Sequence, residues 1–229
     1  MKKQIIVLSP HLDDAALSCF DHITLWRSNY SVTVFTIFSS FESKCVADYS
    51  NSIINKLNVS VNEYELLRKK EDEEFFNKIG LKQYMLNFVD GGFRFHKQSP
   101  LYKTPADLFS GKIVYQDHQI KNKLKIILSR VDKYAERVVI PAAIGSHADH
   151  IIVKEAAEET IQSEKITYFC DYPYALNMQM QLQSSHEAKH IEMSQRKRDL
   201  LNCYESQMPL LFPEGLPHFC EITFSKKST

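Results

Sequence analysis

The chain has 229 residues, the length of one domain with a sizeable core, and no composition shift or linker divides it. Lysine plus arginine and aspartate plus glutamate both number 28, so no overall charge would draw the chain to nucleic acid or an anionic membrane. No apolar run is long enough for a membrane span or a signal peptide, and the five cysteines are scattered without a C-x-x-C pair. We therefore expect a single domain over residues 1–229, in the cytoplasm, with no nucleic-acid partner and no membrane span.

Strand-like and helical patterns alternate along the chain. Short runs rich in apolar and β-branched residues predict strands at residues 5–8, 31–38, 83–89, 137–144, 166–170 and 219–224. The periodic or strongly charged stretches between them predict helices at residues 14–26, 61–78, 119–131, 149–163 and 193–208. Because strands that alternate with helices indicate βαβ units, we expect an α/β, Rossmann-like fold with a mainly parallel twisted sheet flanked by helices.

Two segments lack a clear pattern. Residues 39–58 are polar and irregular, and they predict a loop long enough to have a function of its own. Residues 93–117 contain Pro100, Pro105 and Gly111, and we interpret them as an irregular insertion or lid. The sequence does not define the shape that these two segments would give to a substrate cleft.

A histidine and two aspartates follow the first predicted strand, in the order His11, Asp13 and Asp14. The apolar run at residues 5–8 has no alternation, which is typical of a strand buried on both faces of a parallel sheet, and ligands bind at the carboxyl ends of such strands. His11 and Asp14 are three residues apart across a turn, so both can converge on one cation, while Asp13 points toward a metal-bound water or the substrate. Taken alone, the cluster also fits a solvated turn in which one aspartate caps the following helix.

A second cluster, with the pattern His-x-Asp-His, begins at His147 directly after the apolar run at residues 138–144. If this run and the first are neighbouring parallel strands, both clusters meet at the same edge of the sheet. A catalytic zinc site takes three protein ligands and keeps a fourth position for water. The two clusters would supply such a set in His11, Asp14 and His150. Asp13 and His147 would remain as acid–base groups.

These clusters resemble the signature of the PIG-L/LmbE family of metal-dependent N-deacetylases, a Pro-His-Pro-Asp-Asp-Glu loop after the first strand and a later His-x-Asp-His. This chain has Pro-His-Leu-Asp-Asp-Ala at residues 10–15 and His-Ala-Asp-His at residues 147–150. Leu12 and Ala15 depart from the signature, and neither is a proposed ligand. The resemblance extends over most of the chain and implies an LmbE-like fold.

The resemblance also implies a role for each residue of the two clusters. The implied metal ligands are His11, Asp14 and His150, for Zn²⁺ or alternatively Fe²⁺ or another divalent cation. Asp13 is implied as the general base and His147 as the electrophile or general acid. In this scheme His147 is an imidazolium that Asp149 orients and stabilises.

Weaker features of the family follow in the same order and indicate substrate contacts. Arg68 is expected to bind a polyhydroxyl or anionic ligand, although Arg68 and Glu71 also fit an ordinary i,i+3 pair on a helix surface. Asp90 precedes two glycines at a strand end, where it either binds a sugar hydroxyl or only forms a turn. A Ser-Gln pair at residues 206–207 is the last of these features.

Several other residues are expected to have no role in the site. Arg94, His96 and His118 lie in or next to the irregular segment and could line the substrate cleft, but we interpret them as exposed and without a role. Tyr172 and Tyr174 could stack on a sugar ring, but packing in the core or at the surface is the preferred interpretation.

A rival motif, H-E-x-x-H, occurs at residues 186–190 and is the pattern of zinc metalloproteases, in which a helix places both histidines on one face. Its surroundings are rich in glutamine, serine, glutamate and lysine, and Lys189 puts a cation inside the supposed site. No third ligand follows at a recognised spacing. We therefore interpret this stretch as a solvated polar face.

The resemblance implies hydrolytic removal of the N-acetyl group from a small N-acetylglucosamine-type sugar conjugate, with Asp13 as general base toward metal-activated water. Two alternatives remain open. In the first, the chain is an amidase of the same fold that acts on a larger N-acyl conjugate. In the second, it is a catalytically degenerate sugar-binding protein. The sequence also leaves open the native metal and whether the chain forms a homo-oligomer.

Overall fold

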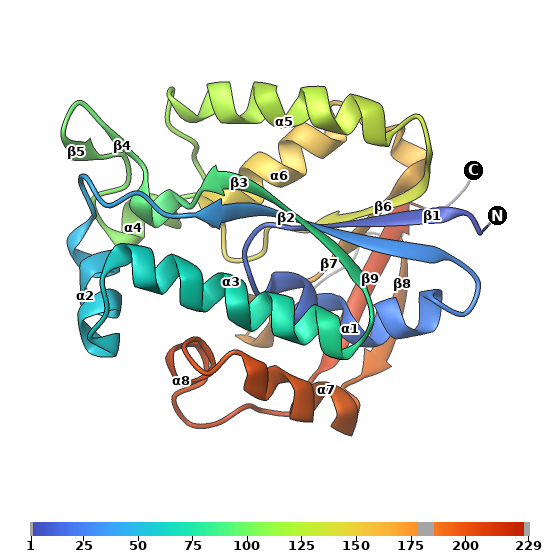
Figure 1. Ribbon diagram of the computed structural model, residues 1–229. Coiled ribbons are helices and arrows are strands. Elements are labelled where there is room, and N and C mark those ends of the chain that lie inside the picture. Colours follow the sequence, from blue (N-terminus) through green and yellow to red (C-terminus); the bar gives the residue numbers. More distant parts are fainter. Residues whose placement is uncertain (1, 178–185, 227–229) are drawn as a thin grey trace.

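The computed structural model describes residues 2–177 and 186–226 and has an α/β architecture (Figure 1). In this part of the chain, seven strands form the main sheet: β1 (Gln4–Ser9), β2 (Ser31–Ser40), β3 (Lys82–Val89), β6 (Ala135–Pro141), β7 (Ile166–Phe169), β8 (His186–Glu192) and β9 (Cys220–Lys226). The flanking helices are α1 (Asp14–Trp26), α2 (Asp48–Leu57), α3 (Val61–Lys78), α4 (Pro105–Leu108), α5 (Asp117–Val131), α6 (Ala148–Glu158), α7 (Gln195–Leu200) and α8 (Met208–Leu211). The predicted fold class is confirmed.

The strands lie in the order β3-β2-β1-β6-β7-β9-β8. The five strands from β3 to β7 are parallel to one another, and β9 is antiparallel to both β7 and β8. From β1 the chain builds β2 and β3 on one side, and it then crosses to the other side of β1 to form β6 and β7. The order therefore reverses between β1 and β6, and such a switch point opens a crevice at the carboxyl ends of the two strands.

Successive side chains of β1 point to opposite faces of the sheet. Ile5 and Val7 pack on the face covered by α1 and α3, whereas Ile6 and Leu8 pack on the face covered by α5 and α6 (Figure 1). All four side chains are at most 1% exposed. Burial on both faces is the reason that the strand has an uninterrupted apolar sequence.

The helices expected at residues 14–26 and 61–78 form with those bounds, as α1 and α3. A capping box fixes the start of α3: the Ser60 hydroxyl accepts the backbone N–H of Glu63, and the Glu63 carboxylate accepts the backbone N–H of Ser60. This reciprocal pair gives a hydrogen-bond acceptor to two N–H groups that would otherwise lack one at the start of the helix.

Two expectations were wrong. The loop expected at residues 39–58 contains α2, whose Ile54 is buried in an apolar cluster with Leu12 and Phe41. The helix expected at residues 193–208 is broken between α7 and α8. There the Glu71 carboxylate accepts both the backbone N–H and the hydroxyl of Ser206, which holds the connecting turn in place.

The strand β8 was also missed, because it is the outermost strand and its residues are mostly polar. Its backbone is paired along its whole length with β9. The pairing with β9 therefore compensates for the weak apolar pattern of the sequence.

Residues 93–117 are irregular, as expected. They contain the short hairpin of β4 (Phe95–His96) and β5 (Ser99–Pro100), followed by the single helical turn α4. The segment lies beside α2 at the end of the sheet where β1 and β6 terminate (Figure 1).

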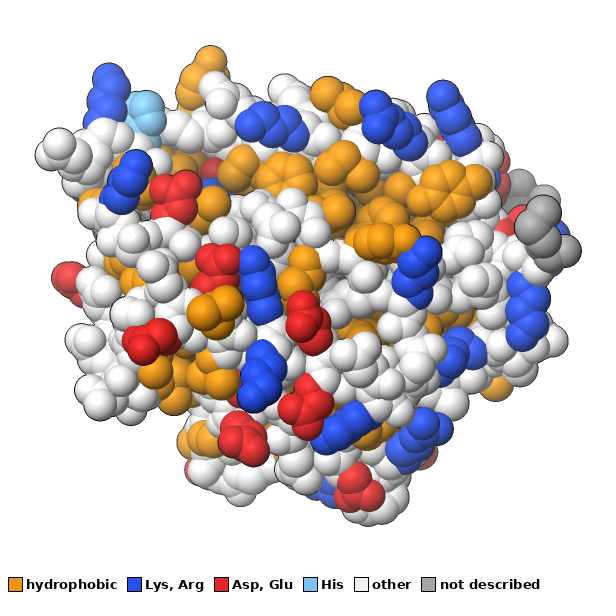
Figure 2. Space-filling view, in the orientation of Figure 1, with side chains coloured by type: hydrophobic (Ala, Val, Ile, Leu, Met, Phe, Trp, Pro, Cys, Tyr) orange, Lys and Arg blue, Asp and Glu red, His pale blue; other side chains and the backbone are white. Residues whose placement is uncertain are grey.

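The molecular surface mixes charges of both signs, and Figure 2 shows lysine, arginine, aspartate and glutamate interspersed on one face. Apolar side chains gather on this face near the edge strand β3, where Tyr84 and Tyr134 are about half exposed. None of the helices in the described ranges has the length and apolar character needed to cross a membrane.

Candidate active site

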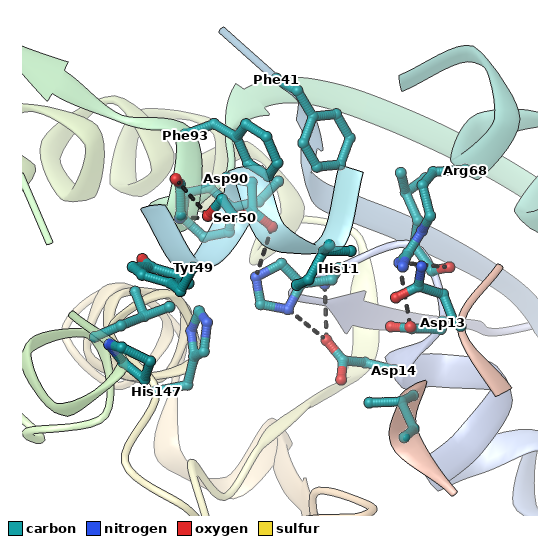
Figure 3. A pocket seen from close by; sticks show the side chains of 18 of the residues that line it. His11, Asp13, Asp14, Phe41, Tyr49, Ser50, Arg68, Asp90, Phe93 and His147 are labelled. Atoms are coloured by element: carbon teal, nitrogen blue, oxygen red, sulfur yellow. Dashed lines mark hydrogen bonds and ion pairs between the residues drawn. The ribbon is translucent and has the colours of Figure 1, made fainter. Parts of the chain in front are cut away.

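The structure brings the two sequence clusters together at the switch point of the sheet. His11 lies between the end of β1 and the start of α1, and His147 and His150 lie at the start of α6, after β6. The ring centroids of these three histidines are 4.8 to 5.3 Å apart. Residues separated by more than 130 positions in the sequence therefore form one site (Figure 3).

The loop after β6 makes a tight turn to reach this position. Gly145 has a φ of +85°, a conformation that L side chains rarely adopt. A Cβ atom at Gly145 would lie 2.5 Å from the Tyr174 ring. The turn thus needs glycine, and Tyr174 packs against it and next to the His150 ring.

Asp14 lies between two of the histidines. Its Oδ2 atom is 3.2 Å from His11 Nδ1 and 3.3 Å from His150 Nε2. Ligand atoms of a tetrahedral site with bonds of about 2.0–2.1 Å are about 3.3–3.4 Å apart. Each of the two distances is that expected between two ligands of one cation, with Asp14 as the shared member of both pairs.

The His150 ring has the hydrogen-bonding pattern of a metal-bound histidine. Its Nδ1 atom is 2.6 Å from Asp171 Oδ1, and its buried Nε2 atom has no hydrogen-bond partner among the described residues. Metal-ligating histidines commonly donate one ring N–H to a carboxylate and leave the other nitrogen for the metal. The unpartnered nitrogen faces Asp14, so the donor set fits a divalent cation.

The carboxylates around His150 control its protonation. Burial lowers the pKa of His150, but Asp14 and Asp171 outweigh burial and raise this pKa to about 9. Burial likewise raises the pKa of Asp14, yet the two imidazoles beside it hold this pKa well below its usual value. Without a cation the site thus keeps an imidazolium next to a carboxylate, and a divalent cation would take the place of the proton.

Asp149 contacts His11 rather than His147 through its carboxylate. Asp149 Oδ2 is 3.0 Å from His11 Nε2 and accepts the backbone N–H of Gly91 over 2.8 Å. A Cβ atom at Gly91 would lie 3.2 Å from both carboxylate oxygens, so glycine permits this close approach. The Asp149 carboxylate, which we predicted to orient His147, therefore contacts and orients His11 instead.

His147 receives a different contact from Asp149. The backbone N–H of Asp149 donates to His147 Nδ1 over 3.1 Å, which leaves the proton of the neutral ring on Nε2. Burial and the nearby imidazoles of His11 and His150 hold the pKa of His147 well below its usual value. The direction of this shift favours a neutral imidazole at His147 over the expected imidazolium.

Asp13 is not a helix cap. It occupies the N-cap position of α1 but its side chain makes no capping hydrogen bond, and it is 8% exposed. Its Oδ2 atom accepts a hydrogen bond from Arg68 Nη2 over 3.1 Å (Figure 3). Burial raises the pKa of Asp13, and the Arg68 guanidinium opposes that rise. The solvated-turn interpretation of this cluster is therefore wrong.

Arg68 and Glu71 do not form a surface pair. Both side chains are buried on α3, where Arg68 binds Asp13 and Glu71 binds Ser206. Asp90 forms the expected turn, because its Oδ1 accepts the Gly92 N–H. Its Oδ2 lies 3.5 Å from His11 Nε2, and binding of a sugar hydroxyl stays a prediction.

A cavity of about 380 Å³ opens beside these groups. His11, Asp13, Arg68, Asp90 and His147 contribute to its lining, and Phe41, Phe93 and Tyr174 add aromatic walls (Figure 3). The volume is in the range of small-molecule sites that combine an apolar wall with a few convergent polar groups.

Two groups of candidate metal ligands with closely spaced ligand atoms are present among the described residues; both include His11, and neither includes Asp14. They are His11 with His147 and His150, and His11 with Asp90 and Asp149, each with ligand atoms within 4.8 Å of one another. In the second group, however, the Asp149 carboxylate is already bonded to Gly91 and paired with Arg94. The unpartnered nitrogen of His150 favours a cation on the Asp14 side of His11.

Sequence reasoning missed two residues that support the site. Asp171 directly follows the short run that forms β7, and its position at a strand end was the available signal. Arg94 was expected to be exposed, but it is 5% exposed and pairs with Asp149. His96 and His118 are exposed, as expected, and Tyr174 lines the cavity.

The rival histidine pair cannot share a metal ion. His186 and His190 lie on the strand β8 instead of a helix. Residues four apart on a strand are about 13 Å from each other, so the H-E-x-x-H geometry is absent.

Comparison with known proteins identifies the family of this chain. The family model of PIG-L, GlcNAc-PI de-N-acetylase, matches residues 6–161. The chain is 24% identical over 198 residues to 2'-N-acetylparomamine deacetylase of Niallia circulans, covering 76% of this chain and 68% of that protein. It is 25% identical over 174 residues to 2'-N-acetylparomamine deacetylase of Streptomyces fradiae, covering 74% of this chain and 57% of that protein.

A solved structure shares the whole fold. The zinc inhibited form of teicoplanin deacetylase Orf2 superimposes with a TM-score of 0.75 over 99% of both chains, at 20% identity. At that identity the likeness concerns the fold alone. The family model, in contrast, matches well over half of the chain and includes both clusters. The chain belongs to the PIG-L family of deacetylases.

Proposed function

We propose that this chain is a metal-dependent hydrolase that removes the N-acetyl group from a small amino-sugar conjugate. The observation that carries the proposal is the unpartnered Nε2 atom of His150, which faces Asp14 next to His11 at the edge of a substrate-sized cavity. Family membership supports the reaction class, and the names of the curated relatives support a sugar-containing substrate.

The residues His11, Asp14 and His150 would hold the cation. When bound, a divalent cation would polarise the amide carbonyl and lower the pKa of a coordinated water. We propose Zn²⁺, with Fe²⁺ or another divalent cation as the alternative. The solved relative is described in a zinc inhibited form, so activity should be compared across several metals at limiting concentrations.

Asp13 is the proposed general base. Water that attacks the amide carbon must lose a proton. Asp13 is a buried carboxylate at the cavity, and its partner is the Arg68 guanidinium. Because Arg68 binds Oδ2 and holds Asp13 in one orientation, the other oxygen, Oδ1, is the atom proposed to accept that proton and pass it to the leaving amine. The products are acetate and the free amino sugar.

His147 is the proposed donor to the carbonyl oxygen. Its Nδ1 atom is occupied by the Asp149 N–H, so the Nε2 proton is the one available at the cavity. A fixed neutral donor stabilises negative charge as it develops on that oxygen. Arg68 and Asp90 are the proposed substrate contacts, with Asp90 accepting a sugar hydroxyl.

The test pairs acetate release with metal content for a panel of N-acetylated sugar conjugates. The panel should include N-acetylglucosamine conjugates and 2'-N-acetylparomamine, together with analogues that carry longer acyl groups. Acetate release that requires metal supports the proposal. Preference for a long acyl group would favour the wider amidase, and metal-independent sugar binding without turnover would favour a degenerate site.

A further inference from the structure

A buried ion pair closes the base of the irregular segment 93–117. Arg94 Nη2 donates to Asp117 Oδ2 over 2.9 Å, so the two ends of the segment are joined. Tyr102, within the segment, donates its hydroxyl to the same oxygen over 2.6 Å. All three side chains are at most 5% exposed. The base of the segment is therefore part of the protein core.

The same guanidinium contacts a carboxylate of the candidate site. Arg94 Nη2 is 2.6 Å from Asp149 Oδ1, and the other oxygen, Oδ2, is 3.0 Å from His11 Nε2. Arg94 Nη1 donates to the carbonyl oxygen of Val89 at the end of β3. A continuous set of contacts thus leads from the irregular segment through Asp149 to the His11 ring.

Arg94 is the cation that Asp117 and Asp149 share. Both carboxylates are 0% exposed, and within the described ranges no lysine or second arginine forms an ion pair with either. Without the guanidinium, two buried carboxylates would face one another with no permanent counter-charge, and they would repel. Asp149 could then not keep its place beside His11.

We infer that Arg94 is a positioning residue for the metal centre. Through Asp149 it holds the His11 ring so that Nδ1 faces Asp14, and it attaches the segment 93–117 to that ligand. The inference rests on the proposed function, because it takes His11 as a metal ligand. Outer partners of metal-bound histidines typically change metal affinity or activity by about 10- to 100-fold.

The test is Co²⁺ binding by the full-length Arg94→Met variant. We expect Co²⁺ affinity to fall by about 10- to 100-fold and the visible absorption bands of the Co²⁺ form to change, since His11 loses its fixed orientation. A purely structural defect would not alter those bands in the folded protein. The titration should be done well below the unfolding temperature of the variant.

Lys197→Met is the matched control. It also removes a buried cation paired with a carboxylate, since Lys197 Nζ is 2.7 Å from Glu221 Oε1 and both side chains are 0% exposed. Its contacts do not include a side chain of the site. It should lower the unfolding temperature but leave Co²⁺ affinity and absorption unchanged.

A double variant tests the route through Asp149. Arg94→Met combined with Asp149→Asn should bind Co²⁺ no more weakly than Asp149→Asn alone, because the arginine acts through that carboxylate. Fully additive losses would overturn the inference. So would wild-type affinity and absorption in folded Arg94→Met, or an equal loss of affinity in Lys197→Met.

Two milder variants keep the inference testable if Arg94→Met does not fold. Arg94→Lys and Asp117→Asn each retain part of the network and should show smaller losses of Co²⁺ affinity in the same direction. Wild-type affinity in both would overturn the inference. If the wild-type protein binds no Co²⁺ at all, the proposed metal-dependent function itself fails, which is a distinct result.

Discussion

The helix α1 contacts two buried ionic clusters of different kinds. At its first residue, Asp14 joins the site cluster of His11, Asp14 and His150. Farther along, the helix contacts the Glu221 cluster, which comprises His22, Lys197 and Glu221. All three side chains of the second cluster are 0% exposed, so burial alone does not distinguish the two.

In both clusters a buried imidazole nitrogen, Nε2 of His22 or of His150, has no hydrogen-bond partner among the described residues. The clusters differ in the surroundings of that atom. Both oxygens of Glu221 are filled: Oε1 accepts from Lys197 and the Asp21 N–H, and Oε2 accepts from the His22 N–H and lies 3.0 Å from His22 Nδ1. None of the three residues lines the cavity of the site. The Glu221 cluster therefore fastens the C-terminal strand β9 and the helix α7 to α1.

In the site cluster, the nitrogen without a hydrogen bond lies next to a carboxylate and a cavity. The Nε2 atom of His150 is buried without a hydrogen-bond partner among the described residues, and the carboxylate next to it is shared by two histidines. A buried nitrogen without a hydrogen bond is costly, and the nearby Asp14 carboxylate leaves room for a cation between the two groups. The comparison teaches that a buried nitrogen without a hydrogen bond marks a functional cluster where, as at His150, it faces a carboxylate shared by two histidines beside a cavity.

The largest predicted effect is on turnover in the site cluster. Asp13→Asn removes the proposed base but keeps the shape of the side chain, so kcat should fall by about 10²- to 10⁴-fold. Metal content should remain that of the wild type, because Asp13 is not a ligand. Steady-state kinetics and metal analysis of one preparation measure both, and wild-type kcat would remove Asp13 from the mechanism.

The second prediction concerns the Glu221 cluster. Lys197→Met leaves the Glu221 carboxylate buried without its cation, which should cost about 3–5 kcal/mol of unfolding free energy. Below the unfolding temperature, kcat and metal content should match the wild type. Urea titration gives the stability, and a large loss of metal in the folded variant would show that the two clusters are not independent.

The third prediction concerns the carboxylate behind His150. Asp171→Asn keeps a hydrogen bond to Nδ1 but removes its charge, so metal affinity should fall by about 10- to 100-fold. Competition with a chelating dye measures this affinity. Glu158→Gln is the control, because the Glu158 carboxylate accepts the Tyr168 hydroxyl at the far end of α6, away from His150. Equal affinities in the two variants would contradict a role for Asp171.

The smallest predicted effect is a pH dependence of stability that is present only in the metal-free chain. A raised pKa stabilises the fold while the group is protonated, so the contribution of His150 is complete below pH 6.5 and is lost as the pH rises through about 9. The Tm of the metal-free chain should therefore fall by a few degrees over this range. The metal-loaded chain should not lose this stability, since the cation replaces the proton. A rising Tm in the metal-free chain would contradict the assignment.

Much of the frame of the site could be predicted from the sequence. The run at residues 5–8 is buried on both faces, and the two clusters follow strands that lie side by side as β1 and β6. The bounds of α1 and α3 also matched, because apolar spacing and a capping box fix them locally. Patterns of this kind depend on neighbours in the sequence, so they are visible without a structure.

Other features depend on contacts between distant residues and were missed. Asp171 has no motif of its own and gains its place only because β7 pairs with β6. Arg94 lies in a segment without periodicity, and its burial follows from the two carboxylates that it meets. The direction of the Asp149 carboxylate is set by the start of α6 and the close approach of Gly91, which the spacing His-x-Asp-His does not encode.

The most direct test of the account is metal content in three preparations: wild type, His150→Ala and the double variant His186→Ala/His190→Ala. The account predicts about one metal ion per chain in the wild type and in the double variant, and almost none in His150→Ala. Acetate release should follow the metal. A wild-type chain without metal, or metal that is lost only with His186 and His190, would contradict the site described at the switch point of the sheet.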